Sequence, residues 1–341
     1  MYQYVVGGGV LIVGDLHVSD RAVVGKHKNY LKNCFDVLAS IRDKVKEMRP
    51  SAVVFLGDLV GTSERNIKSR EVLSMFCKFF MDIGQYSKIF CVRGNHDVGD
   101  FPEFQFLSDL KLFETSVSCD GYFDFYGTDE QRQQGTPEVR FHLVDYGSEK
   151  RELRLKGGST SDVVLGHNNY TIHGVTVWYQ DHDGIELSSL DNFHGVSMVI
   201  SGHIHYPSPE LIATEMQTGG ECSLFYTGSP TRPAERYDKC WYVWFGYDAT
   251  QGCTNYEALD FPLADDVFFD DDEFIEEMSE EDIMDLERKE ALKEVLDEIM
   301  KHRISSTDLL TQVNNIPNAS QAAKEIACHY LQIALDSTSD K

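Results

Sequence analysis

Five short polar motifs follow one another along this chain, and each comes directly after an apolar segment typical of a buried strand. The motifs are Asp-Leu-His at 15–17, Gly-Asp at 57–58, Gly-Asn-His-Asp at 94–97, Gly-His at 166–167 and Gly-His-Ile-His at 202–205. In open α/β sheets, binding sites form at the carboxyl ends of the strands. The positions of the motifs therefore predict an α/β fold with one shared site.

Helical and strand patterns alternate in the first half of the chain. Apolar residues recur at helical spacing from Leu31 to Met48, and Pro50 ends the pattern. A second helix is predicted at 64–83. Strands are predicted at 10–13, 51–56, 88–92, 139–144, 162–165, 172–179, 196–200, 223–226 and 240–245. Two sheets packed face to face, with helices outside, would accommodate this many strands.

The character of the sequence changes near residue 260. Residues 265–290 contain 14 acidic residues and two basic ones, which is about half of the net charge of −25. Helical patterns follow this acidic stretch. We therefore predict a globular domain at 1–260, an acidic linker at 261–278 and a helical region at 279–341.

The net charge disfavours a protein that binds nucleic acid through its overall charge. Basic residues nevertheless gather at 21–32, 42–49 and 150–156. Each cluster is interpreted either as a solvated surface or as a contact to a phosphate backbone, and the sequence leaves both open.

The sequence also predicts a compartment. Eight cysteines without paired spacing favour reduced thiols. No apolar run approaches the length of a membrane span. The apolar opening at 5–13 lacks a basic leader and runs into Asp15, so we interpret it as a buried strand and not a signal peptide. We expect a cytoplasmic protein, or one in the host cytoplasm if its source is viral.

The motifs supply ligands in the number that two divalent cations need. These ligands are the carboxylates of Asp15 and Asp58, the amide of Asn95 and the imidazoles of His17, His167, His203 and His205. Oxygen and nitrogen ligands without thiolate suit Mn²⁺, Fe²⁺ or Zn²⁺. Asp58 is suited to bridge, because a carboxylate can offer one oxygen to each ion. Two adjacent cations activate water for attack on phosphate esters, so we expect a hydrolase of such esters.

His96 and Asp97 are the predicted catalytic pair. The carboxylate of Asp97 is expected to fix the tautomer of His96 and to raise its basicity. A protonated His96 would stabilise the transition state or protonate the leaving oxygen. The competing interpretation is a core histidine paired with a neighbouring carboxylate.

With these residues in this order, the chain resembles the calcineurin-like metallophosphoesterases over roughly residues 8–250. The resemblance implies a four-layer α/β/β/α sandwich with a small helical C-terminal region, and a phosphoesterase with two metal ions, usually Mn²⁺. It implies one ion held by Asp15, His17, Asp58 and His205, and a second held by Asp58, Asn95, His167 and His203.

Within that superfamily, the segment Tyr226–Arg232 is similar to the SbcD-type nuclease subunits of double-strand-break repair, whose phage relatives are similarly short. This resemblance implies a DNA exo- or endonuclease that acts in recombination or repair. It also implies that residues 279–336 dock on an SMC-type ATPase of the SbcC kind. The alternative, that these helices cap the protein's own core, stays open. One departure is Gly61, where many of these nucleases carry a histidine.

Arg93 and Arg232 are the predicted substrate-binding residues. Arg93 stands before the motif at 94–97, as in protein phosphatases, so a phosphatase or small-molecule phosphodiesterase, including one for cyclic nucleotides, is the second hypothesis. Those phosphatases lack the closing motif at 202–205 and have glutamate in place of Asp97. The third hypothesis is a non-catalytic scaffold, which the complete set of motif residues disfavours.

The helix predicted at 64–83 carries more apolar residues than one contact with a sheet needs. They are Leu73, Phe76, Phe79, Phe80 and Ile83. We therefore expect part of this helix to form a homodimer contact, as in related nucleases.

Overall fold

The computed structural model describes residues 3–19, 27–61, 70–97, 102–172, 184–205, 207, 212–215, 221–232, 238–264 and 267–268. The chain divides into two compact units at 1–268 and 269–341, and every described residue belongs to the first. The helices predicted at 279–341 therefore lie outside the described residues. They remain predictions, as do the domain boundaries.

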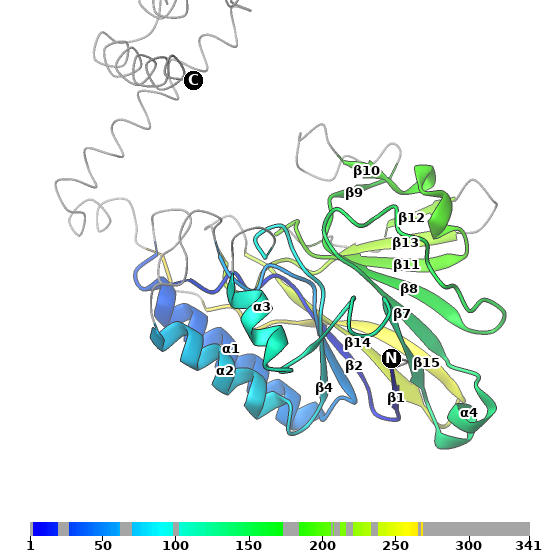
Figure 1. The fold of residues 1–341 in the computed structure, drawn as a ribbon, viewed down its shortest axis with the longest axis horizontal. Coiled ribbons are helices and arrows are strands. Elements are labelled where there is room, and N and C mark those ends of the chain that lie inside the picture. The colour runs from blue at the N-terminus through cyan, green and yellow to red at the C-terminus, as the bar shows by residue number, and fades with distance from the viewer. Residues whose placement is uncertain are drawn as a thin grey trace, which may run out of the picture. The chain divides into compact units, whose positions relative to one another are not determined.

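Two sheets form the centre of the first unit (Figure 1). The six-stranded sheet has the order β15-β14-β2-β3-β4-β5, with β2 Gly9–Val13, β3 Ala52–Phe55, β4 Lys88–Cys91, β5 Glu114–Thr115, β14 Trp241–Asp248 and β15 Cys253–Asp260. The seven-stranded sheet has the order β1-β6-β7-β8-β11-β13-β12, with β1 Gln3–Val6, β6 Tyr122–Tyr126, β7 Val139–Val144, β8 Ser161–Gly166, β11 Val196–Ser201, β12 Ile212–Glu215 and β13 Glu221–Tyr226. Apolar side chains of both sheets pack into one core between them.

The strands that precede the motifs run parallel within each sheet. β2 pairs with β3 and β3 with β4 in parallel, and β8 pairs in parallel with β7 and β11. Every residue of β2 and β3 is buried, as their continuous apolar sequences predict for strands covered on both faces. The parallel arrangement brings the carboxyl ends of the motif-bearing strands to the same edge of each sheet.

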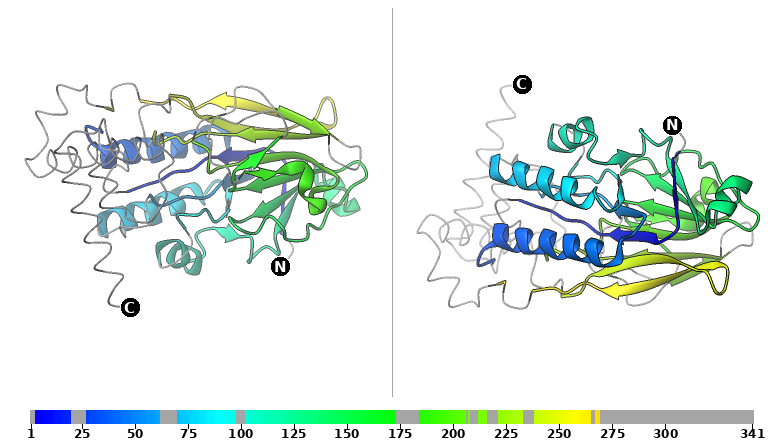
Figure 2. Two further views of the ribbon diagram at one scale, coloured as in Figure 1. Left: turned by 90° about the horizontal axis from the view of Figure 1, so that it is seen from above. Right: turned by 90° about the horizontal axis from the view of Figure 1, so that it is seen from below.

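Three helices cover the outer face of the six-stranded sheet, and Figure 2 shows two of them side by side. They are α1 Tyr30–Met48, α2 Arg70–Ile83 and α3 Pro102–Asp109. The Asn29 side chain caps α1 by accepting a hydrogen bond from the backbone N–H of Lys32. Arg49 ends the helix in the left-handed conformation, next to the proline expected to stop it.

The outer face of the seven-stranded sheet has a different cover in the part of the chain that is described. It consists of β9 Tyr170–Thr171, β10 Ile185–Glu186 and two 3₁₀ turns at Leu187–Ser189 and Asp191–Phe193. A fourth helix, α4 Asp129–Gln134, follows β6. Two packed sheets with few helices confirm the predicted α/β fold class.

The predicted elements match the structure closely where residues are described. The helix expected at 31–48 and the strands expected around 52, 88, 139, 162, 196, 223 and 241 are present. The apolar opening is an exception, because it forms two strands in different sheets and not one. Gly7 and Gly8 separate β1 from β2 with φ angles of 65° and 57°, which residues with side chains rarely adopt.

The aromatic residues of α2 pack inside the chain. Phe76, Phe80 and Ile83 are buried, and the ring of Phe55 on β3 lies 5.9 Å from that of Phe79 and 5.6 Å from that of Phe80. The apolar excess that led us to expect a homodimer is thus largely covered within one protomer. The homodimer remains a prediction without this support.

Two observations concern the compartment. No helix among the described residues is long and apolar enough to cross a membrane. All seven described cysteines are free thiols, and five of them are buried. Cys328 lies outside the described residues.

Candidate metal centre

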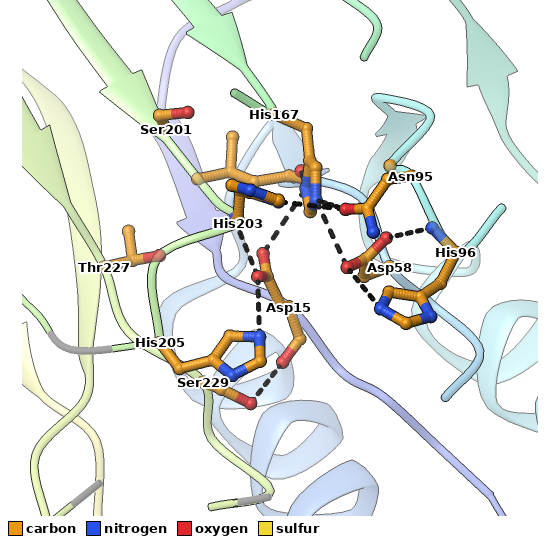
Figure 3. Close-up of polar contacts among 12 residues, drawn as sticks. Asp15, Asp58, Asn95, His96, His167, Ser201, His203, His205, Thr227 and Ser229 are labelled. Atoms are coloured by element: carbon orange, nitrogen blue, oxygen red, sulfur yellow. Dashed lines mark hydrogen bonds and ion pairs between the residues drawn. The ribbon is translucent and has the colours of Figure 1, made fainter. Parts of the chain in front are cut away.

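The seven predicted metal ligands converge from five loops at the carboxyl ends of strands, and Figure 3 labels all of them except His17. Asp15 and His17 follow β2, Asp58 follows β3, Asn95 follows β4, His167 follows β8, and His203 and His205 follow β11. The two sheets therefore contribute opposite halves of one site.

Asp15, His17, Asp58 and His205 form the first ligand group. Each turns one ligand atom toward the others, and these atoms all lie within 4.8 Å of one another. The Nε2 atoms of His17 and His205 are 2.6 Å apart, and His17 Nε2 lies 3.6 Å from Asp58 Oδ2. Four converging donors of this kind suit one divalent cation.

Asp58, Asn95, His167 and His203 form the second ligand group. The Oδ1 atom of Asn95 lies 2.9 Å from His167 Nε2 and 2.9 Å from His203 Nδ1. His167 Nε2 is also 3.2 Å from Asp58 Oδ2. The carboxylate of Asp58 thus belongs to both groups, as a bridging ligand requires.

A backbone carbonyl sets the tautomer of His167. Its Nδ1 atom lies 2.7 Å from the carbonyl oxygen of Leu56, which can only accept, so Nδ1 carries the donated proton. In the neutral imidazole the lone pair is then on Nε2, which faces Asp58 and Asn95. A hydrogen bond from the ring nitrogen that does not bind the metal commonly orients histidine ligands.

Two glycines of the motifs let carboxylates approach the backbone closely. A Cβ atom on Gly94 would lie 2.1 Å from Asp58 Oδ1, and one on Gly202 would lie 2.1 Å from Asp15 Oδ1. The space admits hydrogen bonds from the backbone N–H of His96 to Asp58 and from that of His203 to Asp15, both 2.8 Å. These bonds fix the orientation of the two carboxylates.

The backbone of the site is strained. His17, Asp58 and His203 have φ angles of 44°, 45° and 74°, in the left-handed region that side chains disfavour. Such strain costs on the order of 1–3 kcal/mol for each residue and persists where the surrounding fold imposes it. Three of the seven ligands are therefore held in place at the expense of stability.

The chemistry of the ligands fits a pair of cations. Asp15 Oδ1 and His17 Nδ1 are buried, and neither has a hydrogen-bond partner. Unpaired buried polar atoms are costly, so a cluster of them indicates a missing partner. The Nε2 atoms of His17 and His205 are 2.6 Å apart, so a shared proton or a cation must separate their lone pairs.

The electrostatics lead to the same conclusion. Burial raises the pKa of Asp15 to about 8 and, together with the charge of Asp58, that of Asp97 to about 7. Burial lowers the pKa of His17 to about 4. Burial would also lower the pKa of His167, but the charges of Asp58 and Asp15 outweigh it and raise that pKa to about 10. With these pKa values, Asp15 and Asp97 hold protons near neutral pH, and divalent cations would supply the positive charge that lets Asp15 ionise.

His96 lies at the open side of the first ligand group. Its side chain is 26% exposed, its Nε2 atom lies 3.9 Å from Asp58 Oδ2, and its ring centroid is 5.2 Å from that of His17. The ring is thus placed beside the ligands and remains accessible from outside.

Asp97 does not contact His96 in the way we predicted. Its carboxylate accepts hydrogen bonds from the backbone N–H groups of Leu59 (3.1 Å) and Gly94 (3.0 Å). It therefore joins the loop after β3 to the loop after β4. Its role in this arrangement is to hold the loops of Asp58 and Asn95 together.

The two predicted substrate-binding arginines differ in their surroundings. The guanidinium group of Arg93 lies over the ring of Phe104 at 5.1 Å. That of Arg232 lies over Phe268 at 5.0 Å and donates to the carbonyl of Ala264 at 2.8 Å. Arg232 therefore joins Ala264 and Phe268 to the loop after β13, and a role in binding substrate remains a prediction for both.

Packing explains the glycine at position 61. A Cβ atom there would lie 2.7 Å from the backbone oxygen of His17, and the Gly61 N–H donates to the carbonyl of Val18 at 3.1 Å. The loops after β2 and β3 are thus too close for a residue with a side chain such as histidine at this point.

The segment 226–232 supports the ligand loop after β2. The hydroxyl of Ser229 donates to the carbonyl of Asp15 at 2.9 Å, and that of Tyr30 donates to the carbonyl of His17 at 2.8 Å. The carbonyl of Thr231 accepts from the Asn33 side chain at 2.8 Å. The sequence indicated this segment through its resemblance, but gave no sign of the supporting roles of Tyr30, Asn33 or the Leu56 carbonyl.

Residues 9–207 match the sequence pattern of the calcineurin-like phosphoesterases, and this range contains all five motifs. The chain belongs to the calcineurin-like phosphoesterase family. Membership implies a metal-dependent hydrolase of phosphoesters, which typically uses two divalent ions. The two ligand groups agree with that number.

Solved structures with related folds include a dimetal phosphatase from Danio rerio, with 12% identity, a TM-score of 0.44 and coverage of 74% of this chain and 97% of that chain. Another is a 5′-nucleotidase precursor from Thermus thermophilus, with 12% identity, a TM-score of 0.37 and coverage of 79% of this chain and 57% of that chain. No curated protein matches the sequence. Likenesses this distant say nothing about the substrate of this chain.

Proposed function

We propose that this phosphoesterase is a DNA nuclease subunit that uses two Mn²⁺ ions and acts in recombination or break repair. The observation that carries the catalytic part is the shared position of Asp58 between two ligand groups. When bound, the two cations would activate water and neutralise charge on the phosphate. One cation would be held by Asp15, His17 and His205 together with Asp58. The other would be held by Asn95, His167 and His203 together with Asp58.

The protein's own side chains supply the remaining steps. His96, exposed beside Asp58 and His17, would carry the proton that the leaving oxygen needs. The Asp97 carboxylate accepts hydrogen bonds from backbone N–H groups of both ligand loops. These bonds would keep Asn95 and Asp58 at the spacing that both ligand groups require.

The choice of DNA rests on the resemblance of residues 226–232 to the SbcD-type nucleases and on local basic charge. In this structure that segment supports the ligand loop through Ser229. The basic stretch 150–156 follows β7, and one of its residues, Arg154, pairs with Asp120. A small-molecule phosphodiesterase or phosphatase is the second candidate, because the same ligand groups would serve it equally well.

A substrate panel separates the two candidates. Purified protein with Mn²⁺ or Mg²⁺ is offered linear duplex DNA, single-stranded DNA, bis-nitrophenyl phosphate, nitrophenyl phosphate and cyclic nucleotides. A nuclease degrades the DNA, and Asp58→Asn abolishes this while the buried control Asp162→Asn retains it. Turnover of the small esters with no cleavage of either DNA would favour the second candidate.

The partner proposal has its own test. We propose that residues 279–336 bind an SMC-type ATPase encoded with this protein. Co-purification of the ATPase with the full chain, and its loss when apolar residues such as Leu292 and Ile299 become aspartate, would support the proposal. Unchanged co-purification would argue that these helices serve the protein's own core.

A further inference from the structure

An exposed tyrosine lies directly beside the second ligand group. The ring centroid of Tyr146 is 5.9 Å from that of His203, with the planes tilted by 36°, and 6.4 Å from that of His167. The residue is nevertheless 42% exposed. A large part of an aromatic side chain is therefore open to solvent at the edge of the metal centre.

The backbone holds this residue firmly. The N–H of Tyr146 donates to the carbonyl of Arg93 at 2.8 Å, and the N–H of Arg93 donates to the carboxylate of Asp145 at 2.9 Å. The Asp145 carboxylate also accepts from the hydroxyl of Ser116. These bonds attach the backbone of Tyr146 to the residue that precedes the motif carrying Asn95, so the base of its side chain is fixed relative to the ligands.

The turn after Tyr146 is equally well defined. The N–H of Ser148 donates to the carbonyl of Asp145 at 2.9 Å, and Gly147 adopts a φ of 73°, as the third residue of a type II turn requires. The side-chain amide of Asn192 donates to the carbonyls of Glu149 and Arg151, at 2.8 Å and 2.7 Å. Among the residues that the structure describes, no hydrogen bond to the Tyr146 hydroxyl contributes to this arrangement.

Exposed, preordered aromatic rings in nucleic-acid enzymes commonly stack on bases. Stacking of a base on an aromatic side chain contributes about 1–3 kcal/mol and tolerates every base, because each has a π face. A large apolar ring exposed beside buried charged ligands has no evident role in folding. We propose that Tyr146 is a stacking platform for the nucleobase next to the scissile phosphate.

The geometry also indicates which nucleotide the platform holds. His96, the proposed proton donor to the leaving oxygen, lies against His17 and Asp58 of the first group, whereas Tyr146 lies against His167 and His203 of the second. The stacked base therefore belongs to the nucleoside that keeps the phosphate. This assignment rests on the proposed phosphodiesterase activity and deepens it by naming a nucleoside as the group recognised.

Two diesters with the same leaving group test the platform. The 5′-(p-nitrophenyl phosphate) of thymidine carries a base on the retained side, whereas methyl p-nitrophenyl phosphate has only a methyl group there. The wild type, Tyr146→Leu and Tyr146→Phe are compared with saturating Mn²⁺, and urea unfolding midpoints confirm that the variants fold.

We expect Tyr146→Leu to raise the KM for the thymidine ester about tenfold with kcat nearly unchanged, since stacking acts on binding. The methyl ester should respond less than twofold, and Tyr146→Phe should behave as the wild type. Three results would overturn the platform. They are equal effects of Tyr146→Leu on both esters, an unchanged KM for the thymidine ester, and a KM of the Tyr146→Phe variant as high as that of Tyr146→Leu.

The outcomes also separate this inference from the proposed nuclease activity. If the wild type hydrolyses the thymidine ester with the expected Tyr146 dependence but cleaves no DNA, the nuclease proposal fails and the platform stands. If DNA is cleaved and Tyr146→Leu leaves both esters unaffected, the platform fails and the nuclease stands. If the wild type does not hydrolyse the thymidine ester, the platform is overturned.

Discussion

Two groups of buried ionisable side chains lie on the strands or in the loops that follow them, and they differ in how completely other protein groups form hydrogen bonds with them. The metal centre contains Asp15, His17, Asp58 and His167, and leaves two buried polar atoms, Asp15 Oδ1 and His17 Nδ1, without hydrogen-bond partners. The other set of buried side chains lies away from the metal centre, and we term it the Arg140 network. It contains Asp124 on β6, Arg140 and His142 on β7, and Asp162 on β8.

The Arg140 network is satisfied from within. Asp124 and Arg140 face each other across β6 and β7 and form two hydrogen bonds of 2.7 Å and 2.9 Å. A third guanidinium nitrogen donates to the carbonyl of Arg154, and Asp162 accepts from His142 and from backbone N–H groups. Buried charge that the chain pairs thus serves stability, whereas buried charge left unpaired indicates a ligand.

The largest effect that we expect is a loss of activity when a ligand of the metal centre is replaced. Asp58→Asn removes the carboxylate shared by both ligand groups, so kcat/KM for phosphodiesters should fall about 10³-fold. Steady-state rates with Mn²⁺ measure this, and circular dichroism checks that the variant folds. Retention of a tenth or more of the activity would mean that Asp58 does not bridge the two groups.

The corresponding change in the Arg140 network should affect stability instead. Asp124→Ala leaves the buried Arg140 unpaired, and we expect a loss of about 3–5 kcal/mol in the free energy of unfolding. Urea denaturation measures this, with Asp36→Ala, which breaks an exposed pair with Lys32, as a control that should cost less than about 1 kcal/mol. The kcat of the folded fraction should stay unchanged, and a large fall in kcat would remove the distinction between the two groups.

Added Mn²⁺ should stabilise the protein by binding to the metal centre and not to the Arg140 network. At a Mn²⁺ concentration 100 times the Kd, each occupied site should add about 2.7 kcal/mol to the free energy of unfolding, and excess chelator should reverse the gain. Thermal unfolding with and without Mn²⁺ measures the effect. Asp124→Ala should gain as much as the wild type, whereas Asp58→Asn should gain much less. An equal gain for Asp58→Asn would place the stabilising ions elsewhere.

The smallest effect that we expect is a pH dependence of the stability that Asp162 of the Arg140 network contributes. Burial raises the pKa of Asp162, but hydrogen bonds from His142 and the backbone of Gly157 and Lys156 outweigh it and hold the pKa below its usual value of 3.8. Because the folded pKa is the lower one, the carboxylate stabilises the fold above about pH 4, and this contribution is lost as the pH falls through the folded pKa. Asp162→Asn should therefore cost about 1–2 kcal/mol at pH 7.

Urea titrations at several pH values test this expectation. The stability difference between the wild type and Asp162→Asn should shrink as the pH drops below the usual carboxyl pKa of 3.8. A difference that stays constant down to about pH 3 would show that the carboxylate charge is not responsible.

Sequence reasoning succeeded where local pattern determines structure. The apolar runs of β2, β3, β4 and β8 and the helical spacing of α1 identified these elements, and the residues after each strand identified the candidate ligands that the fold brings together. Ligand positions follow from the rule that loops at the carboxyl ends of parallel strands meet. This part of the site could therefore be predicted from the sequence.

Elements determined by tertiary pairing were not found. β15 has mostly exposed side chains and exists because β14 pairs with it along its whole length. β1 is a short edge strand that pairs with β6, far away in the sequence. β15 lacks the apolar pattern on which the sequence analysis relied, and Val5 and Val6 of β1 were assigned to one strand together with β2.

The same limit applies to the site. The expected contact between Asp97 and His96 failed because backbone N–H groups of Leu59 and Gly94 are better placed to bind that carboxylate. Tyr146 carried no motif at all, and only the fold brings it to His203. Contacts made by backbone groups or by isolated aromatic residues leave no pattern in a single sequence.

The bridging position of Asp58 between two cation sites can be seen in a single diffraction experiment. Crystals of the full chain are soaked in Mn²⁺, and anomalous differences are collected at the manganese edge. We predict two strong peaks on either side of Asp58, one among Asp15, His17 and His205 and the other among Asn95, His167 and His203. A single peak, or two peaks with Asp58 bound to only one of them, would contradict the bridge.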